Sequence, residues 1–155
     1  MPNIPSVDLN NFLSDDQSLK QEFVNKLGKA YQDIGFVALK GHFLKDSDIE
    51  NIYKYIKVFF DLPDEVKSKY ELDGFAGQRG YTSFGKEHAK GKKHGDLKEF
   101  WHFGQYLDDS EYFKLRYPKN LIVDEVPEFN QIGKTVYQSL EKTAIYVLRA
   151  ISLFL

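Results

Sequence analysis

The sequence predicts an α+β fold in which helices pack on a few short strands. Apolar side chains recur at steps of three and four residues in three long segments. Short aromatic or β-branched runs lie between them, and these strands do not alternate regularly with helices as they do around a parallel sheet. The first strand is predicted over residues 4–9, at a sheet edge because Pro5 lacks a backbone N–H.

Two helices and a strand are predicted next. The first helix opens with a capping box that begins at Ser18, and Gly35 ends it. A compact apolar strand over residues 36–39 leads to the second helix, which Asp46 or Ser47 caps. The predicted buried stripe of this helix is Ile49, Ile52, Tyr53, Ile56, Phe59 and Phe60.

The middle of the chain is predicted to contain less regular structure. Pro63 starts a short third helix that ends near Tyr70. Two strands, over residues 80–84 and 97–103, are joined by a glycine- and lysine-rich loop that is too charged to pack. Residues 105–126 are polar, aromatic and aperiodic, so we expect little regular structure there.

A long helix is predicted from Pro127 to the last residue, Leu155. It has neither a glycine stop nor a basic last turn, and an apolar helix face must be covered by something. We therefore expect a domain over residues 1–126, and a linking helix over residues 127–155 that is truncated before a further domain. The alternative is that a partner or the folded body of this chain covers the helix.

Composition excludes several classes of protein. A formal net charge of −2 gives no basic field to attract phosphate, so neither nucleic acid nor a membrane is an expected partner. The chain has no cysteine, which excludes disulfides and thiolate metal sites and fits a reducing compartment. It shows no signal peptide and no apolar run of bilayer length, so a cytoplasmic protein is expected.

An ordered set of motifs carries a resemblance to a known family. In the centre of the chain the motif residues are Gly80-Tyr81, Gly85, Glu87, Asp96-Leu97-Lys98-Glu99-Phe100 and Gly104. The flanking motifs are Gly35 to Leu39 with His42, Phe59 to Lys67, and Pro127-Glu128-Phe129. Together they resemble the N-terminal region of the non-haem iron, 2-oxoglutarate-dependent oxygenases related to isopenicillin N synthase. Gly41 and Phe43 depart from the Asn-His-Gly of that family, and residues 120–123 lack its Trp-Pro.

The resemblance implies a function for the whole protein. Family members bind Fe(II) through His-x-Asp and a distant His on a double-stranded β-helix, or jelly roll, and bind 2-oxoglutarate partly through a later Arg. Two His and one carboxylate leave three iron positions for the oxoacid and O₂. These residues would all lie beyond Leu155, so this chain alone would hold no cofactor and have no activity. Its implied partners are the catalytic domain of the same polypeptide and a small-molecule substrate, which is hydroxylated, desaturated or ring-closed.

The segment His94-Gly95-Asp96 is formally a His-x-Asp motif. Its third ligand would be one of His42, His88 and His102. We reject it as the iron site because the lysines of residues 90–93 disfavour a divalent cation and a flexible loop holds ligands poorly. In the resemblance, Asp96 has a structural role instead, together with Gly80, Gly85, Glu99 and Gly104. A weaker alternative is that His94, Asp96 and His102 bind a metal by themselves.

Arg79, Tyr81 and Lys98 are the candidate substrate contacts. A guanidinium group at Arg79 suits bidentate pairing with a substrate carboxylate, and Tyr81 lies beside it at the start of a strand. Lys98 and Glu99 face opposite sides of their strand, so one of them can face a cavity. The alternatives are structural: a surface Arg, a packed Tyr and an ion pair.

Two classes of function remain open from the sequence. The first is the N-terminal part of an iron and 2-oxoglutarate-dependent oxygenase. The second is a stand-alone, non-catalytic α+β binding module that lacks the jelly roll. Sequence downstream of Leu155 would discriminate between them. The sequence does not separate a 2-oxoglutarate user from a relative that needs only iron, O₂ and substrate.

Overall fold

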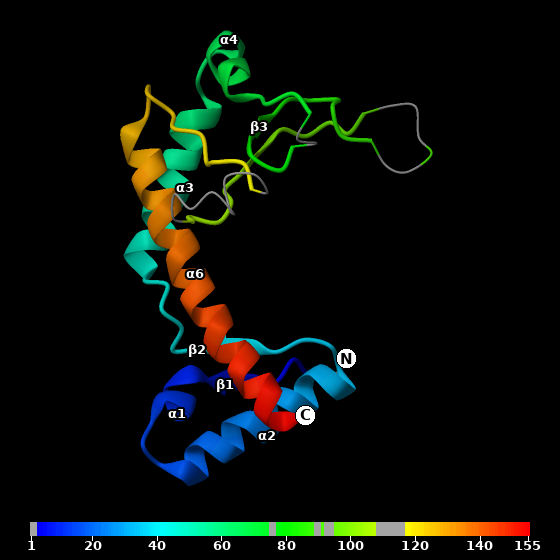
Figure 1. The fold of residues 1–155 in the computed structure, drawn as a ribbon, viewed down its shortest axis with the longest axis vertical. Coiled ribbons are helices and arrows are strands. Elements are labelled where there is room, and N and C mark those ends of the chain that lie inside the picture. The colour runs from blue at the N-terminus through cyan, green and yellow to red at the C-terminus, as the bar shows by residue number, and fades with distance from the viewer. Residues whose placement is uncertain (1–2, 75–76, 89–90, 92–94, 108–116) are drawn as a thin grey trace. The chain divides into compact units, whose positions relative to one another are not determined.

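The computed structural model describes residues 3–74, 77–88, 91, 95–107 and 117–155. The chain divides into two compact units, one of Met1–Lys45 with Gln138–Leu155 and the other of Asp46–Tyr137. In the described residues, strands of three residues form two small sheets, β1 with β2 and β3 with β4 (Figure 1). The predicted α+β fold with few short strands is therefore confirmed. The predicted domain boundary after residue 126 stays a prediction.

The first unit begins with a pair of parallel strands. Strand β1 (Ser6–Asp8) pairs with β2 (Ala38–Lys40), and Val7 lies opposite Leu39. Helix α1 (Leu9–Leu13) follows β1 directly, because the carboxylate of Asp8 accepts the N–H of Asn10 at 2.9 Å. The sequence did not predict α1, since five residues are too few to show a helical repeat.

Helix α2 (Gln17–Asp33) shows where a local cap was placed wrongly. Its N-cap is Asp16, whose Oδ1 accepts the N–H of Ser18 at 2.8 Å, so the predicted capping box beginning at Ser18 is wrong. The carboxylate of Asp16, two residues before Ser18, accepts the free N–H groups at the start of the helix, so Ser18 does not act as the cap. The predicted stop at Gly35 is confirmed: its φ is +84°, and its N–H donates to the carbonyl of Ala30 at 3.0 Å.

One hydrophobic core holds the first unit together. Its buried members are Val7, Leu9, Phe12, Phe23, Val24, Leu27 and Ala150. Ala150 belongs to helix α6 (Pro127–Phe154), whose last part lies in this unit. The contact between α2 and α6 is close, since a Cβ added at Gly28 would lie 2.1 Å from the ring of Phe154. The C-terminal turns of α6 therefore complete this core.

The second unit contains the elements that position the candidate site. In order they are α3 (Asp46–Phe60), α4 (Asp64–Lys67), the 3₁₀ turn η1 (Ser68–Tyr70), β3 (Gly80–Thr82), β4 (Phe100–His102) and the first part of α6. Pro63 is the N-cap of α4, as its place before a short helix predicted. Strands β3 and β4 pair antiparallel, so the predicted strand pair is confirmed, although each strand is shorter than predicted.

Helix α3 corrects part of the predicted buried stripe. Phe59 is fully buried, but Tyr53 is 70% exposed. The core packs against Tyr55, Ile56 and Phe60, so most of the predicted stripe faces the core and only its edge at Tyr53 does not. Asp46 is the first residue of the helix rather than its cap. Periodicity finds a face but does not fix its edges, and a tyrosine at an edge can leave its ring in water.

The final segments follow the prediction. Residues 105–107 and 117–126 contain no helix or strand, and α6 runs from Pro127 to Phe154. The rest of the segment predicted to be irregular, 108–116, lies outside the described residues. Several apolar side chains of α6 are exposed, among them Leu148 and Leu153, both at 63%. None of the helices in the described chain is long and apolar enough to cross a membrane.

Candidate functional site

The strand pair β3–β4 lies on an aromatic cluster. Phe59 stacks on Phe129 with ring centroids 5.1 Å apart and meets the ring of Trp101 edge-on at 4.9 Å. Tyr81 of β3 and Trp101 of β4 are directly opposite each other in the ladder, and both contact Phe59. One face of the strand pair is therefore fixed against α3 and the start of α6 by aromatic packing.

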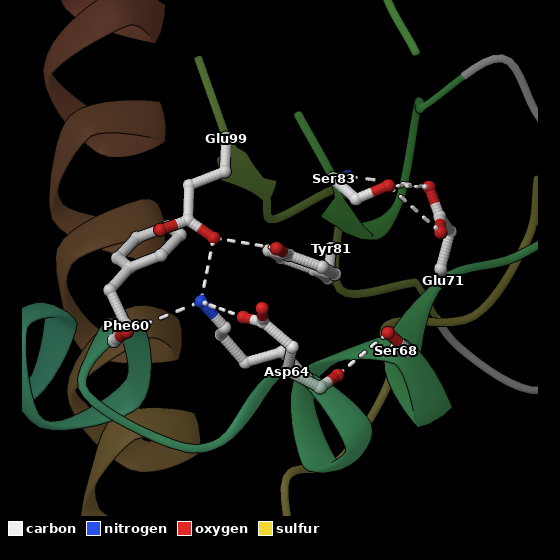
Figure 2. A network of polar contacts seen from close by, with 8 residues as sticks. Phe60, Asp64, Ser68, Glu71, Tyr81, Ser83 and Glu99 are labelled. Atoms are coloured by element: carbon white, nitrogen blue, oxygen red, sulfur yellow. Dashed lines mark hydrogen bonds and ion pairs between the residues drawn. The ribbon is translucent and has the colours of Figure 1, made fainter. Parts of the chain in front are cut away.

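A buried ammonium group lies over the ring of Tyr81, one member of this cluster, and Figure 2 shows the network of polar contacts around it. Lys67, the last residue of α4, has a side chain that is only 5% exposed. Its Nζ is 2.8 Å from Glu99 Oε2, 3.1 Å from Asp64 Oδ1 and 3.4 Å from the carbonyl oxygen of Phe60. Three N–H donors thus meet three acceptors, which is the full capacity of an ammonium group.

Glu99 Oε2 also accepts a hydrogen bond from the hydroxyl of Tyr81 at 2.5 Å. Burial, together with the hydrogen bond to Glu99, raises the pKa of Tyr81 to about 12. The hydrogen bond to Glu99 also raises the pKa of Lys67. At neutral pH this arrangement places a charged lysine and a neutral phenol at one oxygen atom of Glu99.

A second polar group joins the turn η1 to the segment before α6. The hydroxyl of Tyr70 donates to Glu125 and accepts the N–H of Asp124 at 3.0 Å. Lys69 adds an ion pair to Glu125 at 3.3 Å. The hydrogen bond from Tyr70 lowers the pKa of Glu125, and burial raises the pKa of Tyr70. These contacts keep Glu125 ionised in the folded chain.

The strand pair also borders an open cavity of about 530 Å³, to which Tyr81 contributes as well as its neighbour Thr82. Residues of mixed character line it, including Glu71, Thr82, Lys86, His88 and Phe100. The carboxylate of Glu71 accepts the N–H and the hydroxyl of Ser83 at 3.3 and 3.1 Å. Thr82 is 6% exposed, and its hydroxyl has no hydrogen-bond partner in the described chain. The cavity therefore offers a carboxylate, an ammonium group, an imidazole and an aromatic ring.

The structure places the three predicted substrate contacts in different surroundings. The guanidinium group of Arg79 lies against Gly104 and donates to the carbonyl of Gln78 at 2.7 Å. Its Nε is buried without a hydrogen-bond partner in the described residues. Tyr81 is 3% exposed, and its hydroxyl is held by Glu99. A contact from Tyr81 to a ligand would require that hydrogen bond to break.

Lys98 lies on the exposed side. Its ammonium group contacts Glu87 and lies 3.4 Å from Asp96 Oδ2, and the Glu87 contact raises the pKa of Lys98. Glu99, the next residue, faces the buried Lys67, as alternation along the strand predicted. In the described residues no hydrogen bond or ion pair joins Arg79, Tyr81 and Lys98, and their binding roles stay predictions.

Two motif glycines allow close packing around the strand pair. Gly80 has φ +72°, and a Cβ there would lie 2.4 Å from the carbonyl oxygen of Tyr70. At Gly104 a Cβ would lie 1.8 Å from Cζ of Arg79. The N–H of Gly85 donates to the carbonyl of Asp96 at 3.0 Å, which continues the hairpin beyond the strands. This geometry supports the structural roles that the resemblance implied.

The described residues do not fit an Fe(II) site. His94 of the His94-Gly95-Asp96 motif lies outside them. In the part of the chain that is described, no three His, Cys, Asp or Glu side chains converge so that they could hold a metal ion. Nδ1 of His102 contacts the carbonyl of Gly77, and Nδ1 of His88 lies 3.0 Å from the carbonyl of Lys86.

Sequence reasoning missed the partners in both polar groups. Lys67 was seen as part of a motif, but nothing in the sequence linked it to Glu99, which lies 32 residues further on. Tyr70 and Glu125 are 55 residues apart. A buried lysine at the end of a short helix gives no periodic signal, and its partner becomes visible only when the strand pair is placed beside α4.

Comparison with known proteins defines the class. A model of the family described as "non-haem dioxygenase in morphine synthesis N-terminal" matches residues 4–125. The chain belongs to this family of N-terminal regions of 2-oxoglutarate and Fe(II)-dependent oxygenases, so the resemblance seen in the sequence is confirmed.

Individual relatives agree with this assignment. The chain is 28% identical over 159 residues to "2-oxoglutarate-dependent dioxygenase htyE" of Aspergillus rugulosus, covering 96% of this chain and 47% of the relative. It is 36% identical over 92 residues to leucoanthocyanidin dioxygenase of Malus domestica, covering 59% of this chain and 26% of the relative. The chain therefore spans less than half the length of these curated relatives.

Solved structures share the fold. A protein of Caulobacter crescentus assigned to the 2OG-Fe(II) oxygenase family has a TM-score of 0.83 and 33% identity, covering 99% of this chain and 49% of that chain. A full-length Neurospora crassa protein in complex with alpha-KG has a TM-score of 0.74 at 24% identity, covering 97% of this chain and 43% of that chain. The α+β arrangement with its long C-terminal helix is thus similar to that of 2-oxoglutarate oxygenases.

Proposed function

We propose that this chain is the N-terminal part of a non-haem Fe(II) and 2-oxoglutarate-dependent oxidoreductase that acts on a small molecule. The observation that supports this most is the match to the Caulobacter crescentus structure, which covers 99% of this chain but 49% of that one. The reaction is a hydroxylation, a desaturation or a ring closure, and the chain without the rest of the enzyme is inactive.

The rest of the proposed enzyme follows Leu155. A jelly-roll domain there supplies His-x-Asp, a later His and the residues that bind 2-oxoglutarate, with α6 as the link. Iron held by those residues would supply the open coordination positions for the oxoacid and O₂. The residues described here would brace that domain and form one rim of the substrate pocket, with Arg79, Tyr81 and Lys98 as proposed contacts. Cytoplasmic localisation stays a prediction.

The first test is the reading frame of the transcript beyond codon 155. We expect it to continue into a His-x-Asp motif and a later His. The enzyme encoded by the whole frame is then expected to consume O₂ when supplied with Fe(II) and 2-oxoglutarate. A stop codon directly after Leu155 would contradict the proposal and favour the stand-alone binding module.

A second test uses the 155-residue chain itself. Calorimetric titration with Mn(II), a redox-stable substitute for Fe(II), is performed with and without 2-oxoglutarate. We expect no stoichiometric binding in either case. The matched control is His94→Ala. Stoichiometric binding that this substitution abolishes would show that the loop around His94 is a metal site, and that the site does not lie only in a downstream domain.

A further inference from the structure

Lys67 is the most completely enclosed charged side chain in the second unit, among the residues described there. The structure assigns it three acceptors, and the ring of Tyr81 lies 5.6 Å from its Nζ. An ammonium group that is taken out of water must be paired, because its desolvation is costly. The position of Lys67 therefore depends on the acidic side chains that pair with its ammonium group.

Glu99 is the partner that matters most. Asp64 also pairs with Lys67, but its side chain is 90% exposed, and water screens such a pair strongly. The side chain of Glu99 is 17% exposed and approaches Nζ more closely. Oε2 of Glu99 accepts from both Lys67 and Tyr81, so one oxygen atom joins the end of α4 to residues of both strand segments.

The contacts among Lys67, Glu99 and Tyr81 also affect the residues on the opposite face of the strand pair. Side chains alternate along a strand, so fixing Tyr81 and Glu99 on the buried side also sets the neighbouring residues on the other side. Those neighbours are Thr82 and Phe100, which line the 530 Å³ cavity together with Tyr81 itself. A slip of one residue in either strand would exchange the two faces.

We propose that Lys67 is a positioning residue: through Glu99 and Tyr81 it fixes the register of β3–β4 and with it the cavity-facing side of the strand pair. The contacts of Lys67 with Glu99, and of Glu99 with Tyr81, lie within this chain and do not depend on the proposed function. The link of these contacts to substrate binding rests on the proposed function, since only there does the strand pair form a rim of the substrate pocket.

The test compares Lys67→Met and Lys67→Arg with the control Lys57→Met in the 155-residue chain. Lys57 also pairs with an acidic side chain, Asp61 at 2.6 Å, but is 75% exposed. Backbone amide resonances of residues 80–82 and 100–102 are followed by NMR. We expect Lys67→Met to shift or broaden them, Lys67→Arg to restore most of them, and the control to leave them unchanged. Unchanged resonances in folded Lys67→Met would overturn the proposal.

A second readout separates positioning from simple loss of stability. The ring resonance of Tyr81, assigned by its absence in Tyr81→Phe, is titrated with pH. The charged groups around this hydroxyl are Glu99, Lys67 and Asp64. If Lys67 positions Glu99, Lys67→Met releases the hydroxyl, and the pKa of Tyr81 falls from about 12 towards the ordinary value of 10. If Glu99 stays in place without Lys67, losing the positive charge leaves that pKa as high or higher, which refutes the proposal.

A third measurement serves if Lys67→Met does not fold. Double-mutant cycles between Lys67→Gln, which removes the positive charge but keeps an N–H donor, and Tyr81→Phe are measured by urea unfolding, with Glu99 and with Glu99→Gln. We expect a coupling that disappears when Glu99 becomes glutamine, because the carboxylate relays the interaction. Coupling of the same size in both backgrounds would mean that Lys67 and Tyr81 interact directly, and Glu99 would not be the relay. Coupling within error of zero in both backgrounds would equally reject the proposal.

Discussion

At the scale of single residues, the chain depends on groups that are far apart in sequence and share one neighbour. Glu99 Oε2 serves both Lys67 and Tyr81, and the carbonyl oxygen of Tyr70 lies where a side chain at Gly80 would have to be. The sequence identified Gly80, Tyr81 and Glu99 as motif residues. It did not identify the contacts that make these residue types necessary, because those contacts require α4 and the strand pair to be placed together.

Gly80 is the first residue for which a prediction follows. Its φ is +72° and a Cβ there would lie 2.4 Å from the carbonyl oxygen of Tyr70, so Gly80→Ala suffers both backbone strain and a clash with main chain. We expect a loss in the free energy of unfolding of about 3 kcal/mol or more. Urea unfolding of the purified chain measures it.

Gly74 provides the matched control for this substitution. Its φ is +81°, but no atom of the described residues lies within 4 Å of an added Cβ. Gly74→Ala should therefore cost only the backbone strain, about 1 kcal/mol. Equal losses for the two variants would show that the contact with Tyr70 is not what requires glycine at position 80.

Tyr81 gives the chain an alkaline pH dependence. Its pKa is about 12 in the folded chain against an ordinary value of 10, so the unfolded chain releases this proton first. The stabilisation is complete below pH 10 and is lost as the pH rises from about 10 to about 12. A two-unit shift corresponds to about 2–3 kcal/mol in total. Urea unfolding between pH 9 and pH 11 should show the onset of this decline.

Substitution separates Tyr81 from other groups that titrate in the same range. Tyr81→Phe should have a flatter alkaline profile than the unsubstituted chain. Tyr53→Phe, at a tyrosine that is 70% exposed, should retain the original profile. If the Tyr81→Phe profile were as steep as the original, the decline would have another origin.

At the scale of elements, the spacing and type of apolar residues predicted that the long helices and the strand pair exist. The exact ends of these elements depend on which nearby side chain caps them, and spacing does not predict that. The three long helices followed from apolar spacing. The stop at Gly35 followed from glycine's freedom to adopt positive φ, and the short helix after Pro63 followed from proline's fixed φ. Helix α1 was missed because it has only five residues. The N-cap of α2 was misplaced because Asp16 and Ser18 are both good caps, and the sequence alone does not say which one turns towards the helix.

The cap of α2 can be tested directly. Asp16 accepts the N–H groups of Ser18 and Leu19 at 2.8 and 3.3 Å, and the hydrogen bonds from Ser18 lower its pKa. Asp16→Ala should reduce the free energy of unfolding by about 1 kcal/mol at pH 7. Ser18→Ala removes only a side-chain hydroxyl that donates to Asp16 and should cost less. Thermal unfolding of both variants measures the difference, and the opposite order would restore Ser18 as the effective cap.

At the scale of the whole molecule, α6 contributes to two cores and also carries exposed apolar side chains. Phe129 is buried in the core of the second unit and Ala150 in that of the first. The sequence predicted an apolar helix face that needs a cover, and Leu140 and Leu155 of that face are 51% and 96% exposed, while Leu148 and Leu153 are exposed outside it. Periodicity alone could not say which of its apolar positions the chain covers itself, since every one of them repeats at the same spacing.

The exposed positions of α6 lead to the last prediction. Leu148 is 63% exposed, whereas Leu27, in the same unit, is fully buried. Leu148→Ser should change the free energy of unfolding of this chain by less than about 0.5 kcal/mol. Leu27→Ser should cost at least about 3 kcal/mol, because it leaves a cavity and buries a hydroxyl. If Leu148→Ser cost several kcal/mol and the loss grew with protein concentration, the face would be covered by self-association. A small effect here, with a large effect of the same substitution in a longer form of the protein, would mean that the added chain covers this face.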